Sequence, residues 1–293
     1  MNRLDELTSE FEAHRDHLRA VAYRMLGSLS ETDDAVQETW LRASRANTDE
    51  VRNPGAWLTT VLARVCLNIL RARAARRENS LEVHMPDPIV TRVEGSDPAY
   101  QAELADSVGL ALLVVLDSLT ADERLAFVLH DTFSVPFDEI ASILSSTPAA
   151  ARQLASRARR RVKDAPAPDR DSARQHVVVD AFFAASRDGD FDALVALLHP
   201  DVVLRADGGP DRPDVSAILR GAQRVAGNAA VYAEYAPLAH RALVNGTPGA
   251  VVGTPEDPIA VIAFTVSGGR IVAIDVLADP DRLRSLGSSA WVG

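Results

Sequence analysis

A basic segment near the middle of the chain, residues 148–163, carries side chains suited to nucleic-acid chemistry. Arginine can bond a guanine edge through two hydrogen bonds or pair with phosphate, while glutamine and serine add base or backbone hydrogen bonds. Pro148 has the fixed φ suited to a first helical position, and sixteen helical residues span about 24 Å, enough to lie across a major groove. The candidate contact residues are Thr147, Arg152, Gln153, Ser156, Arg157 and Arg160.

The residues just before this segment predict the first helix of a helix-turn-helix. Large aliphatic side chains repeat there at i, i+3 and i+4, and two carboxylates occupy the first turn, where the helix dipole favours them. A short polar turn follows, in which Ser146 or Thr147 can cap the second helix. The alternative is a solvated basic face at the end of a domain. The apolar residues are Ile140, Ile143 and Leu144 in the first helix and Ala151, Leu154 and Ala158 in the second.

The charge distribution separates two basic segments from an acidic remainder. The net charge is −10, which by itself opposes binding to a phosphate backbone. However, no Asp or Glu occurs between residues 51 and 77 or between residues 140 and 163, and arginines concentrate in both stretches. Because the acidic remainder repels phosphate, we expect the chain alone to bind DNA weakly and to need a partner that supplies more positive surface.

Length and composition favour a multidomain globular protein. The 293 residues suffice for two or three domains, and 47% apolar residues allow each a core. Cys66 is the only cysteine, which excludes an internal disulfide and a cysteine-rich zinc site, and the seven histidines are scattered, so no metal or cofactor is expected. The N-terminus has neither a signal sequence nor a long apolar run, so the predicted compartment is the cytoplasm, without a membrane partner.

Hydrophobic periodicity predicts two helical regions joined by a linker. Residues 1–78 form the first region, with three helices separated by breaks at residues 27–30 and at Asn53. Residues 79–97 contain proline and glycine without a sustained period, and when extended this linker could span about 60 Å. That reach corresponds to roughly eighteen base-pair rises of B-DNA. The second helical region, residues 98–164, ends in the helix-turn-helix.

Two local signals mark helix and domain boundaries in the second half of the chain. Thr120 and Glu123 form a capping box that predicts the start of a helix. Residues 165–170 are rich in proline and charge and predict a hinge. The remaining domain, residues 171–293, would therefore be attached to the helical regions by a short tether.

The C-terminal domain changes from helical to mixed patterning. Two predicted helices are followed by strands rich in Val, Leu and Ile, and Ser267, Gly268 and Gly269 favour a tight hairpin turn between the last two strands. Helices followed by a meander of antiparallel strands indicate an α+β domain. The predicted helices are residues 172–187 and 191–199, and the predicted strands are residues 202–206, 238–245, 250–253, 258–266 and 270–276.

Taken together, the helical regions resemble a bacterial sigma factor of the extracytoplasmic-function group. Residues 11–77 resemble region 2, with the acidic and aromatic string of residues 33–41 and the Asn53-Pro-Gly-Ala-Trp57 helix opening, and residues 116–163 resemble region 4. The resemblance implies that the chain directs core RNA polymerase to promoters, with the β′ clamp and the β flap of polymerase as partners. The residues implied to dock on the clamp coiled coil are Asp34, Gln37, Glu38, Trp40 and Leu41.

The resemblance also implies two surfaces that read promoter DNA. The helix that starts at Pro54 and the loop before it would melt and read the minus-10 element, which requires an apolar wedge, a pocket for an unstacked base and cations for the backbone. The helix of residues 148–161 would read the minus-35 element in the major groove. For Trp57, a simple core position is the alternative. The implied minus-10 residues are Asn53, Trp57, Arg64, Arg71, Arg73 and Arg76.

Residues 171–293 resemble the SnoaL-like branch of the nuclear-transport-factor-2-like fold, in which a curved sheet wraps around helices to form a conical pocket. This extension is implied to regulate the sigma core in cis, by contacting both helical domains and holding them in a compact arrangement. Two motifs carry this resemblance, Asp207-Gly-Gly-Pro210 and Asp279-Pro-Asp-Arg-Leu283. Pro210 replaces the third glycine of the first motif, and residues 84–88 match only loosely the linker motif of the subgroup of sigma factors that bear this extension. The implied regulatory residues are Asp207, Gly208, Gly209, Asp279, Pro280, Asp281 and Leu283.

A SnoaL-like enzyme or small-molecule sensor fused to an ordinary DNA-binding regulator is the alternative function. Asp207, His199, His240 and Asp275 are the available acids and bases, but they show no catalytic spacing, and we expect no enzyme activity and no catalytic residues. A small molecule in the C-terminal pocket is a further candidate partner, because mostly apolar concavities are common binding sites. The polymerase-docking string discriminates the two functions, since a repressor fused to an enzyme has no need of it.

Overall fold

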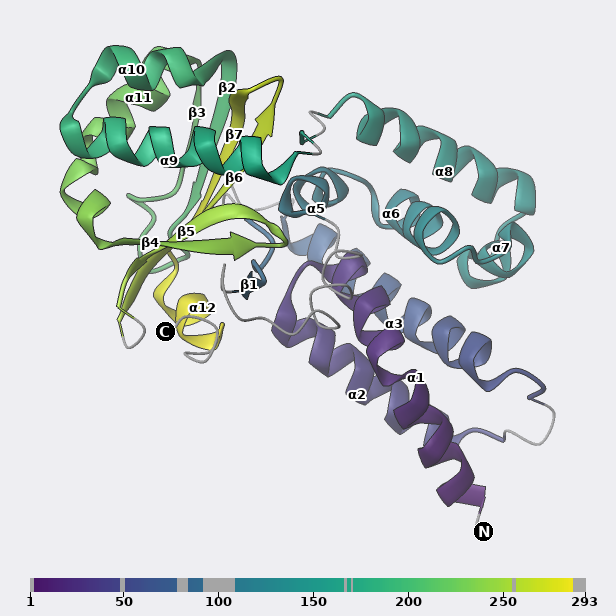
Figure 1. Ribbon diagram of the computed structural model, residues 1–293. Coiled ribbons are helices and arrows are strands. Elements are labelled where there is room, and N and C mark those ends of the chain that lie inside the picture. Colours follow the sequence, from purple (N-terminus) through teal and green to yellow (C-terminus); the bar gives the residue numbers. More distant parts are fainter. Residues whose placement is uncertain are drawn as a thin grey trace. The chain divides into compact units, whose positions relative to one another are not determined.

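The computed structural model describes residues 3–47, 51–77, 84–91, 109–165, 168–169, 171–254 and 257–286. The chain divides into two compact units, whose elements are labelled in Figure 1. The helical unit comprises Met1–Leu81 and Val115–Asp164, and the C-terminal unit comprises Glu82–Val114 and Ala165–Gly293. The first predicted helical region and residues 115–164 of the second therefore share one unit, whereas residues 98–114 and most of the predicted linker belong to the other.

Three long helices form the first part of the helical unit: α1 (Arg3–Leu26), α2 (Leu29–Arg45) and α3 (Pro54–Arg77) (Figure 1). They pack against one another through buried residues that include Leu18 and Leu62. Ser28 caps α2 by accepting from the backbone N–H of Glu31, and Asn53 Oδ1 accepts from the backbone N–H of Ala56 (3.1 Å) at the start of α3. The three predicted helices and their breaks are confirmed.

The second part of the helical unit contains the end of α5 (Leu110–Asp117), then α6 (Ala121–Phe127), the π-helix η1 (Val128–Thr132), α7 (Phe137–Leu144) and α8 (Pro148–Lys163). The predicted capping box is present, because Thr120 and Glu123 exchange side-chain to backbone hydrogen bonds. The helix-turn-helix is also confirmed, with Ser145 in the left-handed region (φ 52°) after α7 and Thr147 as the N-cap of α8.

The buried face of α8 is rotated slightly from the predicted one. Ala151, Ala155 and Ala158 are buried, whereas Leu154 is only partly buried. Small side chains let α8 approach α6 and α7 closely.

Two arginines join the two parts of the helical unit, in which α3 contacts α6 and α7. The guanidinium of Arg124 on α6 is 2% exposed, donates to the carbonyl of Arg24 (3.3 Å) and pairs with Asp117 (3.2 Å). Arg73 on α3 pairs with Glu31 and lies 3.9 Å from the same Asp117 carboxylate. Asp117 thus lies between one cation from each part. We call Arg73, Asp117 and Arg124 the arginine network.

In the C-terminal unit, helices pack on a mixed sheet (Figure 1). Phe182, Leu194, Val225 and Phe264 belong to one buried apolar cluster that joins α9, α10, α11 and the sheet. The predicted second helix ends two residues early, and α11 and η2 were not predicted. The helices are α9 (Ser172–Asp188), α10 (Phe191–Leu197), α11 (Ala222–Val231), the 3₁₀-helix η2 (Ala233–Leu238) and α12 (Pro280–Ser285).

The sheet has the order β1-β4-β5-β6-β7-β2-β3 and is mixed. All described neighbours pair antiparallel except β2 and β7, which pair parallel, so the predicted purely antiparallel meander is wrong at this position. The parallel pair forms because two helices and four strands separate β2 from β7 along the chain. β1, within the predicted linker, and β3 were not predicted. The strands are β1 (Val90–Thr91), β2 (Leu198–Asp207), β3 (Ala217–Arg220), β4 (Ala239–Val244), β5 (Thr247–Gly253), β6 (Pro258–Ser267) and β7 (Arg270–Leu277).

The predicted hinge is anchored at Asp169. The backbone N–H of Asp169 donates to the carbonyl of Val266 (2.8 Å), and its carboxylate accepts from the N–H groups of Gly268 (2.9 Å) and Gly269 (3.0 Å). These N–H groups, that of Gly269 foremost, hold the pKa of Asp169 below its usual value. Both glycines have positive φ (60° and 74°), which confirms the predicted tight turn between β6 and β7.

The arginine network predicts a large stability effect at Arg124. We expect Arg124→Met to lower the free energy of unfolding of the helical unit by about 3 kcal/mol, because it removes one partner of a buried ion pair. Urea unfolding monitored by tryptophan fluorescence measures this change, since Trp40 and Trp57, two of the three tryptophans, belong to the helical unit. Arg45→Met, at an exposed position of α2, is the matched control and should change the free energy by less than about 0.5 kcal/mol. Equal effects of the two substitutions would contradict a structural role for Arg124.

Candidate docking groove, nucleic-acid interfaces and linker clamp

A groove with a volume of about 610 Å³ lies between α1 and α2. Its lining includes the rings of Phe11 and Trp40, whose centroids are 5.1 Å apart. Arg19 and Asp33, which pair at 3.0 Å, and Gln37 add polar groups to the lining. An apolar floor with a charged rim is suited to binding a helix of another protein. Two of the predicted docking residues, Gln37 and Trp40, therefore line a groove.

The other predicted docking residues lie on the adjoining face of α2. Asp34, Glu38 and Leu41 follow one another at i, i+4 and i+7, and Leu41 is an exposed large apolar side chain. Glu38 pairs with Arg42 (2.7 Å) one turn away, and both side chains are nearly half exposed. Such a surface pair contributes only about 0.5 kcal/mol, so Glu38 can exchange its partner at little cost.

The start of α3 presents predicted minus-10 residues to solvent. Asn53 and Arg64 are exposed. Trp57 is partly buried, so its exposure is intermediate between that of a core residue and that of a wedge that separates DNA strands. Farther along α3, the Arg71 guanidinium donates through Nε (3.2 Å) and Nη2 (2.8 Å) to one carboxylate oxygen of Asp122 on α6. Arg71 is exposed, but in this arrangement it already has an acidic partner.

Two further predicted minus-10 residues have different outcomes. The Arg73 side chain is only 12% exposed and belongs to the arginine network, so in this arrangement it cannot contact DNA. In the sequence Arg73 is one of several arginines that indicate a basic face. In the structure its guanidinium instead donates to the carbonyl of Leu26 (3.0 Å) and to the carboxylate of Glu31. The side chain of Arg76 lies outside the described residues.

The exposed face of α8 carries most of the predicted minus-35 residues. Gln153, Ser156 and Arg160 are exposed at i, i+3 and i+7 along the helix. The Arg152 guanidinium lies over the ring of Phe137 on α7, 5.5 Å from the centroid. This cation–π contact orients the arginine while leaving it exposed.

Thr147 and Arg157 are tied to the protein itself. Thr147 Oγ1 accepts from the backbone N–H of Ala150 (3.2 Å) and so caps α8. Arg157 Nε donates to Glu123 Oε1 (2.9 Å), and Arg161 pairs with the other oxygen at 3.4 Å. Burial by itself would raise the pKa of Glu123, but the hydrogen bonds from Arg157 and Thr120 outweigh it, and the pKa is lowered. Glu123 is therefore a firmly ionised partner.

Adjacent carboxylates in the first turn of α6 thus hold two arginines that were predicted to contact DNA. Asp122 binds Arg71 of α3, and Glu123 binds Arg157 of α8. DNA phosphates would have to displace these carboxylates to gain the same cations.

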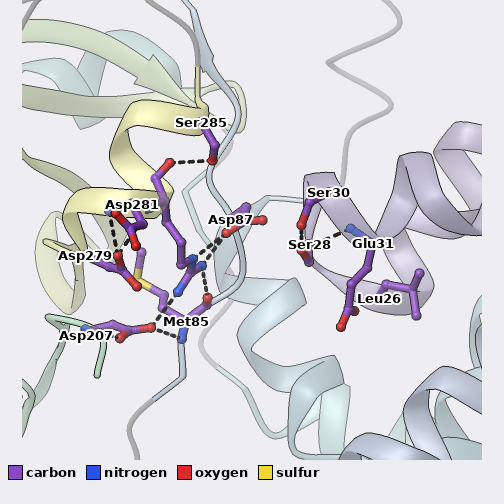
Figure 2. Close-up of polar contacts among 12 residues, drawn as sticks. Leu26, Ser28, Ser30, Glu31, Met85, Asp87, Asp207, Asp279, Asp281 and Ser285 are labelled. Carbon is purple, nitrogen blue, oxygen red and sulfur yellow. Dashed lines mark hydrogen bonds and ion pairs between the residues drawn. The ribbon is translucent and has the colours of Figure 1, made fainter. Parts of the chain in front are cut away.

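Residues 84–91 of the predicted linker are bound to the C-terminal unit chiefly by one arginine. Arg282 on α12 donates to the carboxylates of Asp87 (2.7 Å) and Asp207 (2.7 Å) and to the carbonyl of Met85 (2.5 Å). Asp207 also accepts from the backbone N–H of Met85 (2.9 Å), and Figure 2 shows Met85, Asp87 and Asp207 close together. Both carboxylates are buried. We call Met85, Asp87, Asp207 and Arg282 the linker clamp.

Backbone pairing extends the contact beyond the linker clamp. Ile89 donates to Asn245 Oδ1 (3.0 Å) and accepts from the N–H of Asn245 (2.8 Å), and Val90 of β1 pairs with Val244 of β4. Pro86 and Pro88 are buried. Residues 84–88, which depart from the subgroup's linker motif, are therefore part of a segment that is docked on the C-terminal unit.

The glycine loop after β2 is pressed against its neighbours. A Cβ atom on Gly208 would lie 2.3 Å from the carbonyl oxygen of Arg212, and one on Gly209, whose φ is +72°, would lie 2.3 Å from an Asp279 carboxylate oxygen. A larger side chain at Gly209 would force the loop away from the start of α12, whereas one at Gly208 would disrupt the packing inside the loop itself. Pro210 is exposed, so the departure at this position lies away from the close contacts.

The C-terminal motif builds the helix that presents Arg282. Asp279 caps α12 by accepting from the N–H groups of Asp281 (2.9 Å) and Arg282 (3.2 Å). Pro280 occupies the first turn and Leu283 is buried, whereas the exposed Asp281 pairs with Arg284 (2.5 Å). These predicted regulatory residues thus position a side chain that was not predicted.

Arg282 and Asn245 are the residues that sequence reasoning missed. Arg282 lies inside the motif of residues 279–283. The two carboxylates that it bonds are buried in the structure, and buried carboxylates require a cation as partner. Asn245 has a positive φ of 49°, which marks the tight turn after β4, but nothing in the sequence indicates that its side chain bonds the linker.

A cavity of about 220 Å³ in the C-terminal unit is lined by 22 residues, 16 of them apolar. Alternation along β7 turns Ile274 and Val276 toward the cavity and Asp275 to the other face. Asp275 pairs there with Arg205 (2.9 Å), and burial raises its pKa. His199, His240 and Asp207 do not line the cavity either, so none of the acids and bases considered from the sequence lies in it.

Within the described ranges, no three His, Cys, Asp or Glu side chains gather in a way that could hold a metal ion. Nor does any described helix combine the length and apolar composition needed to cross a bilayer.

Comparison with known proteins identifies relatives of both helical regions. The family model for Sigma-70 region 2 matches residues 11–76, and that for Sigma-70, region 4 matches residues 109–162. The chain is 41% identical over 289 residues to the ECF RNA polymerase sigma factor SigJ of Mycobacterium tuberculosis H37Rv, which covers 94% of this chain and 92% of SigJ. It is 32% identical over 291 residues to the probable ECF RNA polymerase sigma factor SigI of the same strain, covering 98% of both chains.

A solved structure extends the similarity to the fold. The crystal structure of the extracytoplasmic function sigma factor SigJ from Mycobacterium tuberculosis matches with a TM-score of 0.76 and 39% identity, covering 94% of this chain and 97% of that one. The match therefore includes the C-terminal unit.

The linker clamp predicts how residues 84–91 respond to loss of Arg282. We expect Arg282→Ala to accelerate amide hydrogen exchange of this segment by about tenfold or more, because each hydrogen bond to a charged group contributes about 1.5–3 kcal/mol. Mass spectrometry of the full chain measures the rate. Arg284→Ala, two residues away on α12, is the control and should leave the segment unchanged. Equal protection in both variants would show that β1 pairing alone holds the segment.

Proposed function

This chain belongs to the extracytoplasmic-function sigma factors of RNA polymerase, and we propose that its C-terminal unit controls its access to promoters. As a member of this family it is a transcription initiation factor rather than an enzyme. The C-terminal unit has the expected SnoaL-like fold, an α+β domain whose sheet and helices enclose a pocket. Its place of action is the cytoplasm, where core polymerase and promoter DNA are found.

Core polymerase binds the face of α2 in this proposal. Gln37 and Trp40 in the groove and Asp34, Glu38 and Leu41 beside it form one surface with both apolar and acidic character. The β′ clamp coiled coil is the partner of this surface, and the β flap contacts the region-4 helices. The weak Glu38–Arg42 pair supports this assignment, since Glu38 is free to change partners.

Promoter DNA binds two surfaces that the chain must separate. Asn53, Trp57 and Arg64 at the start of α3 serve the minus-10 element, and the exposed face of α8 serves the minus-35 element. Arg71 contributes to the minus-10 surface only after its ion pair with Asp122 is broken. Arg157 likewise contributes to the minus-35 surface only after its ion pair with Glu123 is broken. Arg73 acts in the arginine network instead.

The observation that carries the regulatory proposal is the bonding of α3 to α6. Arg71 pairs with Asp122, and the arginine network joins the same two helices. Two separated promoter elements require the two DNA-reading parts to come apart, whereas here they form one compact unit. We therefore assign this arrangement to a closed, inactive state of the sigma core.

The linker clamp maintains the closed state by shortening the tether. Six residues, 78–83, separate the end of α3 from the docked segment, and their maximum reach is about 20 Å. On the other side, five residues, 164–168, separate α8 from Asp169, which is bonded to the C-terminal unit. Short tethers give the helical parts an effective concentration in the millimolar range, so weak contacts suffice to keep them closed. Release of residues 84–91 would return the linker to its full reach.

Transcription in vitro tests this function. With core polymerase and a library of candidate promoters, we expect Arg282→Ala in the full chain to give about fivefold more transcript than the wild type, because it opens the linker clamp. A truncation after Pro166 should also give more transcript than the wild type. Arg284→Ala is the control and should match the wild type. Less transcript from Arg282→Ala would contradict an inhibitory clamp, and no transcript from any form would contradict promoter direction itself.

Substitutions on α8 distinguish base reading from phosphate contact. We expect Arg152→Ala to cost about 1–3 kcal/mol of promoter binding and to relax specificity at one base position, because Phe137 orients its guanidinium toward one site. Arg157→Ala should have the same cost if Arg157 leaves Glu123 to read a base. Filter binding to a randomised minus-35 element measures both effects. Uniform loss across sequences, with a shallower salt dependence, would make either residue a phosphate contact.

A further inference from the structure

The apolar cavity of the C-terminal unit and the linker clamp share one loop, residues 207–216. Asp207 at its start holds Met85 and Arg282, while Arg212 and Val215 farther along line the cavity. A ligand in the cavity would therefore contact the loop that binds the linker.

Close contacts inside this loop leave little room for independent movement. A Cβ atom on Gly208 would lie 2.3 Å from the carbonyl oxygen of Arg212 and 2.9 Å from Val215 Cβ. Ala278, which also lines the cavity, donates to the carbonyl of Asp207 (2.7 Å) and accepts from Arg212 Nη1 (3.4 Å). Displacement of the cavity wall is therefore transmitted to the backbone of Asp207.

The lining defines the chemical class of ligand. Leu204 and Ile274 are buried at the floor, while Tyr232 and Asp214 are exposed at the mouth. Arg212 and Asp214 offset each other's charge, and Asn228 supplies an amide. The volume of about 220 Å³ is below the roughly 300–1,000 Å³ that drug-sized ligands occupy. A neutral molecule of one or two rings with a single hydrogen-bonding group fits this combination.

We infer that the cavity binds such a molecule and that its binding strengthens the linker clamp. A ligand packed against Arg212 and Val215 holds residues 207–216 in the conformation that places Asp207 against Met85 and Arg282, so ligand binding and linker docking favour the same loop conformation. Positive coupling follows, and it is reciprocal: the docked linker strengthens ligand binding by the same factor. The consequence for transcription, retention of the closed state, rests on the function proposed above.

Calorimetry with 2-naphthol, a neutral two-ring probe, tests the inference on the full chain. We expect saturable binding with one site per chain. Asp87→Asn, which weakens the linker side of the clamp without touching the cavity, should reduce the affinity for 2-naphthol at least about fivefold. Asp192→Asn, at an exposed position of α10, is the matched control and should leave the affinity unchanged.

Two further measurements locate the site and the charge preference. Ala229→Phe fills the cavity from α11 and should abolish binding of 2-naphthol. The anion 2-naphthoate should bind the wild type at least about tenfold more weakly than 2-naphthol does, since its carboxylate must be desolvated beside Asp214. Saturating 2-naphthol should also slow amide exchange of residues 84–91 in the wild type, a change that Ala229→Phe removes.

Absence of saturable binding, or tighter binding of 2-naphthoate, would overturn the proposed ligand class. Equal affinity in the wild type and Asp87→Asn, with unchanged exchange of residues 84–91, would overturn the coupling. These results are independent of the transcription assay. If 2-naphthol binds and couples but Arg282→Ala leaves transcription unchanged, the ligand site stands and the regulatory function fails.

Discussion

The guanidinium of Arg282 is the interaction on which the organisation of the C-terminal unit depends. It bonds two buried carboxylates, Asp87 and Asp207, and the Met85 carbonyl, groups that are distant in the sequence. Buried carboxylates are costly unless they are paired and hydrogen-bonded, so removal of this one cation would leave two of them uncompensated. Lysine could not replace it, because only the planar guanidinium donates in several fixed directions at once.

The helical unit uses the same device at a different place. Asp117 lies between Arg73 of α3 and Arg124 of α6, and Arg71 reaches Asp122 a short distance along the same helices. Exposed pairs such as Arg71–Asp122 are individually weak and exchangeable, whereas the Arg124 contact is dry and costly to break. A closed arrangement built in this way can be stable and still yield to a polyanion that offers the exposed arginines better partners.

In the proposed function, regulation by this chain reduces to competition for arginines and for linker length. The carboxylates of α6 and the phosphates of DNA compete for Arg71 and Arg157. The C-terminal unit and the open sigma core compete for residues 84–91. In this proposal the overall charge of −10 favours the closed state in the first competition until polymerase supplies additional positive surface.

The sequence by itself determined the elements whose signals are local. Helical periodicity placed α1, α2, α3, α7 and α8, the capping box placed α6, and the glycine pair placed the β6–β7 turn. The two sigma regions and the C-terminal SnoaL-like domain were also evident from motifs. Each of these signals depends on residues within a few positions of one another, where spacing alone fixes the geometry.

Only the tertiary structure decided the long-range pairings. The parallel contact of β2 with β7, the strand β1 inside the predicted linker, and the burial of Arg73 each depend on partners far away in the sequence. The same holds for Arg282, which looks like any other surface arginine of a short helix. An arginine's side chain is the same whether it meets phosphate, a carboxylate or water, so its role is set by which acidic groups the fold brings within reach.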